Sequence, residues 1–172
     1  MTIRRLDPSD WARFREIRLE MLRAAPRAYG ATQAEWAAKP EREIRDWLST
    51  VHTLALFDGP RILGAAGFHR RGGSRATHRA EVIAVYLRPE ARGQGHSTRL
   101  FAALADAGRA EGLLQLELEV ADWNAPAIAA YERAGFVRVG VMPRAMRDGV
   151  RFTDDLVMVL PLDAGTSGTL RA

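Results

Sequence analysis

Several residue types are absent or scarce in this chain, and each absence excludes a class of protein. The 172 residues contain no cysteine, which excludes disulfides, a thiolate nucleophile and cysteine-ligated metals. Lys39 is the only lysine, so the phosphate loop Gly-x-x-x-x-Gly-Lys-Ser/Thr is excluded as well. No run approaches about 20 apolar residues and the first residues lack an apolar signal core, so we expect a cytoplasmic protein with no membrane partner. The four histidines form no helical pair, and we expect no metal.

Positive charge comes almost entirely from arginine, and the net charge is +4. The basic stretch from His69 to Arg79 would suit a nucleic-acid-binding domain if it formed one stripe. The arginines are instead spread along the whole chain, which is typical of compositional bias. We therefore expect a solvated loop between two strands and no nucleic-acid partner. If this loop has a further role, attraction of an anionic cofactor is the simplest one.

A chain of this length suits a single domain, which we predict over residues 1–162, with a Gly-, Ser- and Thr-rich tail at 163–172. Hydrophobic periodicity and turn signals predict a strand at 2–6, helices at 11–24 and 41–49, and a hairpin of strands 53–57 and 61–68. One face of the first predicted helix carries the following residues: Trp11, Phe14, Ile17, Arg18, Met21 and Leu22.

The most informative segment is Arg92–Leu100, directly after the apolar run Val82–Leu87. It is typical of a strand, a tight turn and a helix whose first turn is built from Gly, Ser and Thr. Such a helix start presents unpaired backbone N–H groups and the positive end of the helix dipole, which together bind phosphate. Gly93 and Gly95 remove Cβ where an anion must approach the backbone, and Arg92 can add a charge.

Two phosphate-binding motifs remain once the lysine-dependent loop is excluded. The dinucleotide fingerprint Gly-x-Gly-x-x-Gly needs a third glycine where Thr98 stands, and it belongs earlier in a chain. The residues Arg92-Gly93-Gln94-Gly95 instead resemble the Arg/Gln-x-x-Gly-x-Gly/Ala pattern of the GCN5-related N-acetyltransferases (GNAT). Ser97 departs from that pattern at its last position, and His96 stands where the family has an aliphatic residue.

A second segment strengthens this resemblance. The alternating run Leu114–Val120 predicts a strand with one buried face, and Asp122–Phe136 resembles the family segment Asn-x-x-Ala-x-x-x-Tyr-x-x-x-Gly-Phe. Asn124 suits a helix N-cap, and Gly135 suits the left-handed position that ends a helix. The residues and the resemblance thus agree on a strand, a short helix and a further strand.

The resemblance implies an α/β (α+β) fold with a mixed, mostly antiparallel central sheet flanked by helices. It also implies acetyl-coenzyme A as co-substrate and direct transfer of its acetyl group to an amine acceptor. The backbone of Val85, Tyr86 and Leu87 would pair with the pantetheine arm and supply a donor to the thioester oxygen. The residues expected to bind the cofactor are Val85, Tyr86, Leu87, Arg92, Gly93, Gln94, Gly95, His96, Ser97, Thr98, Asn124 and Tyr131.

Tyr131 occupies the family's acid position, from which a phenol can protonate the leaving thiolate. The alternative is a half-buried aromatic that packs on the sheet, just as Asn124 can either bond the cofactor or merely cap its helix. Glu81 is the candidate base, and the alternative there is a strand-edge carboxylate paired with Arg79 or another arginine.

Candidate acceptor contacts are Tyr29, Glu35 and Glu119, of which Glu35 is placed in a loop after the first helix. Glu117 and Glu119 alternate with leucines, which is more typical of solvent-facing residues. The acceptor itself stays open, and a non-catalytic acyl-coenzyme A sensor is the alternative function. A homodimer is compatible with the family, although no feature of the sequence specifies one.

Overall fold

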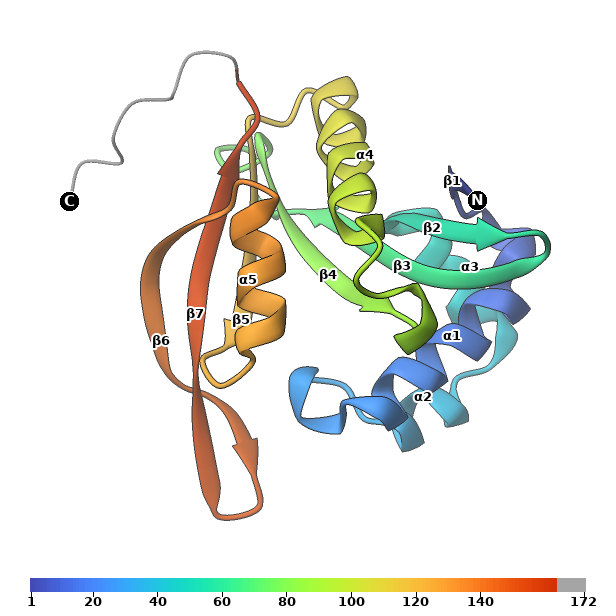
Figure 1. Cartoon of the computed structure of the whole chain (residues 1–172), viewed down its shortest axis with the longest axis horizontal. Coiled ribbons are helices and arrows are strands. Elements are labelled where there is room, and N and C mark those ends of the chain that lie inside the picture. Colours follow the sequence, from blue (N-terminus) through green and yellow to red (C-terminus); the bar gives the residue numbers. More distant parts are fainter. Residues whose placement is uncertain (164–172) are drawn as a thin grey trace. The chain divides into compact units, whose positions relative to one another are not determined.

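The computed structural model describes residues 1–163, and within them the chain forms two compact units (Figure 1). The first unit contains residues 1–69 and 83–104, and the second contains residues 70–82 and 105–163. The fold is the predicted α/β class, with one mostly antiparallel sheet of strand order β1-β2-β3-β4-β5-β7-β6. The predicted tail lies outside the described residues, except for Asp163.

The elements, in chain order, are these: β1 (Thr2–Arg5), α1 (Trp11–Ala24), α2 (Gln33–Ala38), α3 (Glu41–Thr50), β2 (His52–Asp58), β3 (Arg61–Arg70), β4 (Arg79–Leu87), α4 (His96–Ala110), β5 (Gln115–Ala121), α5 (Ala125–Arg133), β6 (Val137–Asp148) and β7 (Arg151–Pro161). Short 3-10 turns occupy Pro8–Asp10, Pro26–Ala28 and Pro89–Ala91.

In the first unit, both faces of the hairpin of β2 and β3 are buried. Successive side chains of a strand point to opposite faces, so neighbouring residues belong to different clusters. Ala55 and Phe57 belong to a core cluster that also holds Phe14, Ile17 and Met21 of α1. Leu56, between them in sequence, belongs to a separate cluster with Leu63 and Ala91. The helices α1, α2 and α3 all contribute to the first cluster, which therefore fixes them against one face of these strands.

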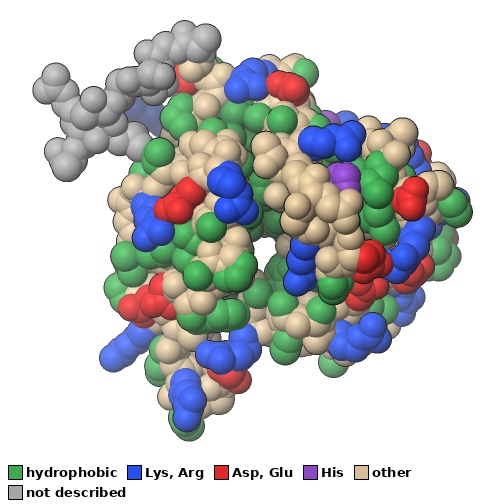
Figure 2. Space-filling model, in the orientation of Figure 1, with side chains coloured by type: hydrophobic (Ala, Val, Ile, Leu, Met, Phe, Trp, Pro, Cys, Tyr) green, Lys and Arg blue, Asp and Glu red, His purple; other side chains and the backbone are tan. Residues whose placement is uncertain are grey.

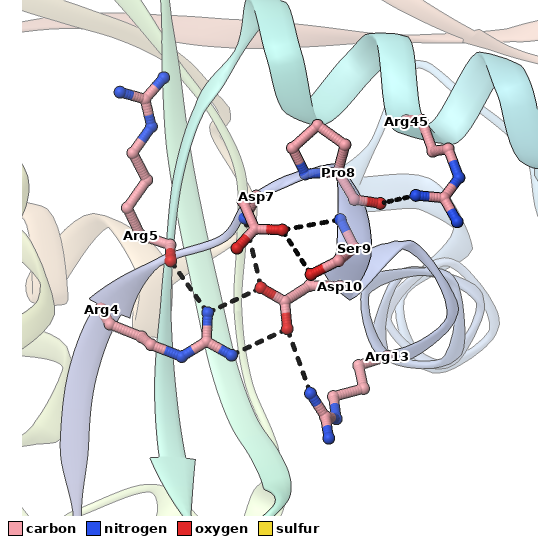
Figure 3. Close-up of polar contacts among 8 residues, drawn as sticks. All are labelled: Arg4, Arg5, Asp7, Pro8, Ser9, Asp10, Arg13 and Arg45. Carbon is pink, nitrogen blue, oxygen red and sulfur yellow. Dashed lines mark hydrogen bonds and ion pairs between the residues drawn. The ribbon is translucent and has the colours of Figure 1, made fainter.

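The entry to α1 is fixed by a buried carboxylate (Figure 3). Asp10 is 3% exposed and receives two hydrogen bonds from the guanidinium of Arg4, at 2.7 and 2.8 Å. It also accepts from the backbone N–H of Asp7 at 3.2 Å and from Nη1 of Arg13 at 3.2 Å. The hydrogen bond from Arg4 is the main reason that the pKa of Asp10 falls to about 2. This ion pair ties β1 to the start of α1.

In the second unit, β5 pairs in parallel with β4 at Arg79–Glu81 and antiparallel with β7 along its whole length. The long strands β6 and β7 are the last two elements in the sequence, and they form an antiparallel hairpin, drawn in orange and red in Figure 1. Helix α5 is capped by Asn124, whose Oδ1 accepts from the backbone N–H of Ala127 at 3.4 Å, and Gly135 follows it with φ +96°. Both terminal signals of the predicted helix are confirmed.

The predicted strands and helices are confirmed to within one or two residues at most ends, and the helix predicted at 11–24 has those bounds. Helix α2 was missed. Glu35 was predicted to lie in a loop, and this was wrong because it lies in α2. The side chain of Thr32 accepts from the backbone N–H of Glu35, and the carboxylate of Glu35 accepts from that of Thr32. The spacing Thr-x-x-Glu is the signal of this capping box.

Candidate active site

The end of β4 carries the backbone that the sequence assigns to the cofactor. Ala84 has φ +55°, a left-handed conformation that is rare for a residue with a Cβ and that interrupts the regular pleat of the strand. The residue after it, Val85, is half-buried, whereas Tyr86 is buried. Nothing in the sequence signals this irregularity, because alanine has no preference for positive φ. Such outliers are concentrated at functional sites.

The loop between β4 and α4 has the backbone geometry of an anion cradle. Gly93 and Gly95 have φ +72° and +74°, and a Cβ built on either would meet no atom within 4 Å. The loop backbone is therefore open on the side where a side chain would stand. At the start of α4 the backbone N–H of Arg99 bonds to the carbonyl of Gly95 at 3.2 Å, which leaves the preceding N–H groups outside the helical ladder. These residues fit a pyrophosphate.

The side chains of the loop mostly hold the loop itself. Nε of Arg92 donates to the carbonyl of Leu87 at 3.0 Å, and the guanidinium lies 5.7 Å from the ring centroid of Tyr86. Nε2 of Gln94 donates to the carbonyl of Glu90 at 2.7 Å. Two of the predicted cofactor contacts thus also shape the turn after β4.

The first residues of α4 differ in exposure. Thr98 is exposed and Ser97 is half-buried, whereas His96 is only 8% exposed. Both ring nitrogens of His96 are enclosed without a hydrogen-bond partner among the described residues. A buried polar group of this kind costs about 1–3 kcal/mol unless water or a ligand satisfies it.

Tyr29 connects the turn after α1 to the irregular part of β4. Its hydroxyl donates to the carbonyl of Val85 at 2.8 Å, and burial raises the pKa of the phenol to about 12. The ring of Tyr29 also lies beside the guanidinium of Arg18, at 5.4 Å from its centroid. Tyr29 was predicted as an acceptor contact, and the structure places its hydroxyl against Val85, a residue predicted to bind the cofactor.

The second unit holds Asn124 and Tyr131, at the start and near the end of α5. Tyr131 is 9% exposed, and its ring packs edge-on against Phe136 with centroids 5.7 Å apart. Asn124 uses its side chain as the helix cap, which is one of the two roles considered for it. The packing of Tyr131 is compatible with either of its two predicted roles.

Glu117 was predicted to face solvent, and this was wrong because it is 4% exposed. Arg79 donates to it through Nε and Nη2, at 2.9 and 2.7 Å, and Nε of Arg71 bonds to the other carboxylate oxygen. Burial alone would raise the pKa of Glu117, but the hydrogen bonds from these arginines outweigh burial and lower it. The basic loop therefore supplies partners for a buried carboxylate rather than a free charged surface.

Glu81 joins the same cluster. Its Oε2 lies 2.9 Å from Nη1 of Arg71, so the ion pair that was the alternative to a base role is present. Glu119, two residues beyond Glu117 on β5, is exposed as predicted. On the neighbouring strand, burial and then Glu119, Asp122 and Asp154 raise the pKa of Asp155.

The described part of the chain has no helix that is both long and apolar enough to cross a membrane. Within residues 1–163 no group of three or more His, Cys, Asp or Glu is arranged to hold a metal ion. On the face drawn in Figure 2, arginine and lysine side chains are interspersed with acidic and apolar ones.

Comparison with known proteins decides the family. The model of the acetyltransferase (GNAT) family matches residues 11–136, which include the glycine loop and α5. The chain belongs to the acetyltransferase (GNAT) family. The match confirms the resemblance predicted from the two sequence segments.

Several curated relatives are themselves acetyltransferases. The chain is 33% identical to the mycothiol acetyltransferase of Geodermatophilus obscurus over 130 residues, which are 70% of this chain and 41% of that one. It is 29% identical to the thialysine N-epsilon-acetyltransferase of Caenorhabditis elegans over 60% of this chain and 63% of that one. The matched part therefore spans less than two thirds of the length of these relatives.

Solved GNAT structures share the fold along nearly the whole chain. Protein yncA of Salmonella typhimurium, solved with its cofactor acetyl-CoA, has a TM-score of 0.82 at 22% identity and covers 99% of both chains. A phosphinothricin acetyltransferase of Sinorhizobium meliloti, in complex with acetyl-CoA, has a TM-score of 0.80 at 24% identity, covering 98% of this chain and 91% of that one. These similarities establish the GNAT fold.

One buried charged residue of this GNAT chain was not singled out from its sequence. Arg18 was assigned only to the apolar face of the first helix, and it is indeed buried there, at 5% exposure. The signal for Arg18 was present in the sequence, because it is a cation in an otherwise apolar helical stripe. Charged side chains are almost never fully buried unless they are paired, so such a position is unusual.

Proposed function

We propose that this chain is an acetyl-coenzyme A-dependent N-acetyltransferase that moves an acetyl group to a primary amine by direct attack in a ternary complex. The observation that carries the proposal is the open glycine loop at the start of α4, which follows the irregular end of β4 in a GNAT-family chain. Location in the cytoplasm and dimerisation stay predictions.

The loop would hold the cofactor through its backbone. The N–H groups from Gly93 to Thr98 and the positive end of the α4 dipole attract the pyrophosphate, and the positive φ of the two glycines leaves room for it. Because the ring of His96 is buried, we expect its contribution to come from its backbone N–H. Acetyl-coenzyme A, when bound, supplies the activated acetyl group.

Transfer to an amine makes three demands on this chain. A fixed donor must stabilise the negative charge on the thioester oxygen, and a backbone N–H of Val85, Tyr86 or Leu87 is suited to this because it needs no reorganisation. The leaving thiolate needs a proton, which we assign to the Tyr131 hydroxyl. The amine must lose a proton, directly or through water.

Glu81 is the proposed acceptor of that amine proton, and Arg71 holds its carboxylate in place at 2.9 Å. Asn124 is assigned to cap α5, with a further bond to the cofactor as a compatible role.

The acceptor is proposed only as a class. Relatives are named mycothiol acetyltransferase, thialysine N-epsilon-acetyltransferase and L-methionine sulfoximine/L-methionine sulfone acetyltransferase, and these names support a small amine-bearing molecule. The alternative is a module that binds acyl-coenzyme A as a sensor without turnover.

A thiol-release assay separates the two functions. Purified protein is mixed with acetyl-coenzyme A and a panel of small amines, amino acids, polyamines, aminoglycosides and peptides, and free thiol is followed with a chromogenic disulfide. We expect release that depends on one class of amine, and a loss on the order of 10²-fold in kcat for Tyr131→Phe if its proton transfer is lost. Tight cofactor binding with no release above the no-amine control would identify the sensor instead.

A further inference from the structure

Arg18 is a buried cation with no acidic partner. The residue is 5% exposed, yet within the described residues it forms no ion pair. Its Nε is enclosed without any hydrogen-bond partner, and Nη1 donates to the sulfur of Met21 at 3.0 Å, which is a weak acceptor. Burial lowers its pKa to about 10, so the side chain stays protonated at neutral pH. The fold therefore encloses a positive charge that the chain does not neutralise.

The contrast with Arg88 in the same unit is informative. Arg88 is also 5% exposed in its side chain, but Nη2 pairs with Glu16 at 2.9 Å and with Glu20 at 3.0 Å. Both carboxylates come from α1, the helix that carries Arg18. The chain thus supplies acidic partners to one buried arginine of this unit and none to the other.

Aromatic rings surround the unpaired guanidinium. Its Cζ lies 4.9 Å from the ring centroid of Trp36 and 5.4 Å from that of Tyr29. Ring faces stabilise a cation, but they leave its N–H groups without acceptors. The two rings fix the position of the Arg18 guanidinium but accept no hydrogen bond from its N–H groups.

Tyr29 links this guanidinium to the proposed reaction centre. The same ring that lies beside Arg18 carries the hydroxyl that donates to the carbonyl of Val85 at 2.8 Å. Val85 follows the positive-φ residue Ala84 and belongs to the backbone assigned to the thioester. One tyrosine side chain therefore separates Arg18 from that strand.

We propose that Arg18 binds a carboxylate of the acceptor, so that the substrate of this enzyme is an amine that also carries a carboxylate group. The planar guanidinium matches a carboxylate with two parallel hydrogen bonds, and such a pair in a site shielded from water is strong. An anionic acceptor would satisfy N–H groups that the chain leaves unsatisfied. The inference depends on the proposed acetyl transfer in one respect, which is where the amine lies. Binding of the carboxylate by Arg18 does not depend on that transfer.

The test uses two matched pairs of probes: L-norleucine with L-norleucinamide, and 6-aminohexanoate with 6-aminohexanamide. Each pair differs only in whether the acid group is charged or amidated. Amidation lowers the pKa of an adjacent α-amino group, so the rates are compared per neutral amine. For at least one pair, we expect the acid to have a kcat/KM on the order of 10- to 100-fold higher than its amide, the range of a charged hydrogen bond.

Arg18→Met removes the charge while keeping a long apolar side chain, and Arg23→Met removes an exposed arginine from the same helix as a control. In Arg18→Met we expect KM for the acid to rise on the order of 10- to 100-fold. The KM values for the amide and for acetyl-coenzyme A should stay within about twofold. The Tm should be unchanged or higher, because replacing an uncompensated buried charge by an apolar group is often stabilising.

Calorimetric titration of each probe into the protein saturated with coenzyme A reads out binding without turnover. The carboxylate site is supported if an acid binds, its amide does not, and Arg18→Met loses the binding of the acid. This holds even if no probe is acetylated. The absence of acetylation would then count against the proposed acetyl transfer alone. The carboxylate site is overturned if each acid and its amide are used equally, or if a preference for the acid survives in Arg18→Met. It is also overturned if neither acid binds. A rise in the KM of acetyl-coenzyme A alone would assign Arg18 to the cofactor and also overturn it.

Discussion

At the scale of single residues, the enclosed polar side chains of this GNAT protein divide into those with partners and those without. Asp10, Arg88 and Glu117 each have at least two oppositely charged partners, which offset the cost of burial. Arg18 and His96 have buried nitrogen atoms that the described chain leaves unsatisfied and no charged partner, whereas Arg88 leaves only its Nε unsatisfied beside its paired Nη2. Because unsatisfied buried groups cost stability, residues that keep them are the ones to examine for a ligand.

The position of His96 gives a test of this reasoning. Replacing it by leucine, which has a similar volume and needs no hydrogen bonds, should raise the free energy of unfolding by about 1 kcal/mol because two unsatisfied nitrogens are removed. Coenzyme A affinity should change by less than about threefold, since backbone N–H groups carry the binding. Urea unfolding and calorimetric titration measure the two quantities. A clear loss of affinity would mean that the ring itself contacts the cofactor.

At the scale of elements, strands and helices with strong periodicity were predicted well. The helix α1 has an apolar stripe and a preceding Asp-Pro-Ser-Asp signal, and α5 has its Asn cap and terminal glycine. Helix α2 was missed because it has only six residues and too few apolar positions to set a period, although its capping box was visible. Glu117 was misplaced because alternation alone cannot reveal that arginines from a loop and from β4 would cover one carboxylate.

The junction of β1 and α1 provides a prediction for stability against pH. The pKa of Asp10 is about 2 in the folded protein and near 3.8 when unfolded, so its ionised form stabilises the fold. This contribution is complete above about pH 4–5, and it is lost as the pH falls through 3.8 towards 2. Asp10→Asn should cost about 2 kcal/mol at pH 7 and flatten the loss of stability between pH 4 and 2.

Urea unfolding at several pH values measures this effect, with Asp46→Asn as the control for an exposed carboxylate on α3. The control should keep the wild-type slope of stability against pH. An unchanged slope in Asp10→Asn would show that the pair with Arg4 does not stabilise the junction.

At the scale of the whole molecule, the fold class, the family and the glycine loop could be predicted because each depends on a local pattern of residue types. The left-handed Ala84, the link from Tyr29 to Val85 and the isolation of Arg18 could not be predicted. Each of these depends on which distant segments meet, and residues 29 and 85 are far apart in the sequence. The acceptor site is therefore the part of the molecule that only tertiary structure could suggest.

Binding of coenzyme A also acts on the whole molecule, because a ligand that binds only the folded state raises its stability in proportion to the logarithm of ligand concentration. Gly95→Asp places a carboxylate in the loop that is assigned to phosphate. Gly112→Asp is a matched control, since Gly112 has the same φ of +74°, no atom within 4 Å of a Cβ, and a place at the opposite end of α4.

The most direct measurement is the Tm of wild type, Gly95→Asp and Gly112→Asp at increasing concentrations of coenzyme A. The backbone strain is similar in the two variants, so both should unfold at a similar temperature without ligand. Coenzyme A should raise the Tm of wild type and of Gly112→Asp, and should leave that of Gly95→Asp unchanged. A ligand-dependent rise in Gly95→Asp equal to that of wild type would contradict the assignment of this loop to the cofactor.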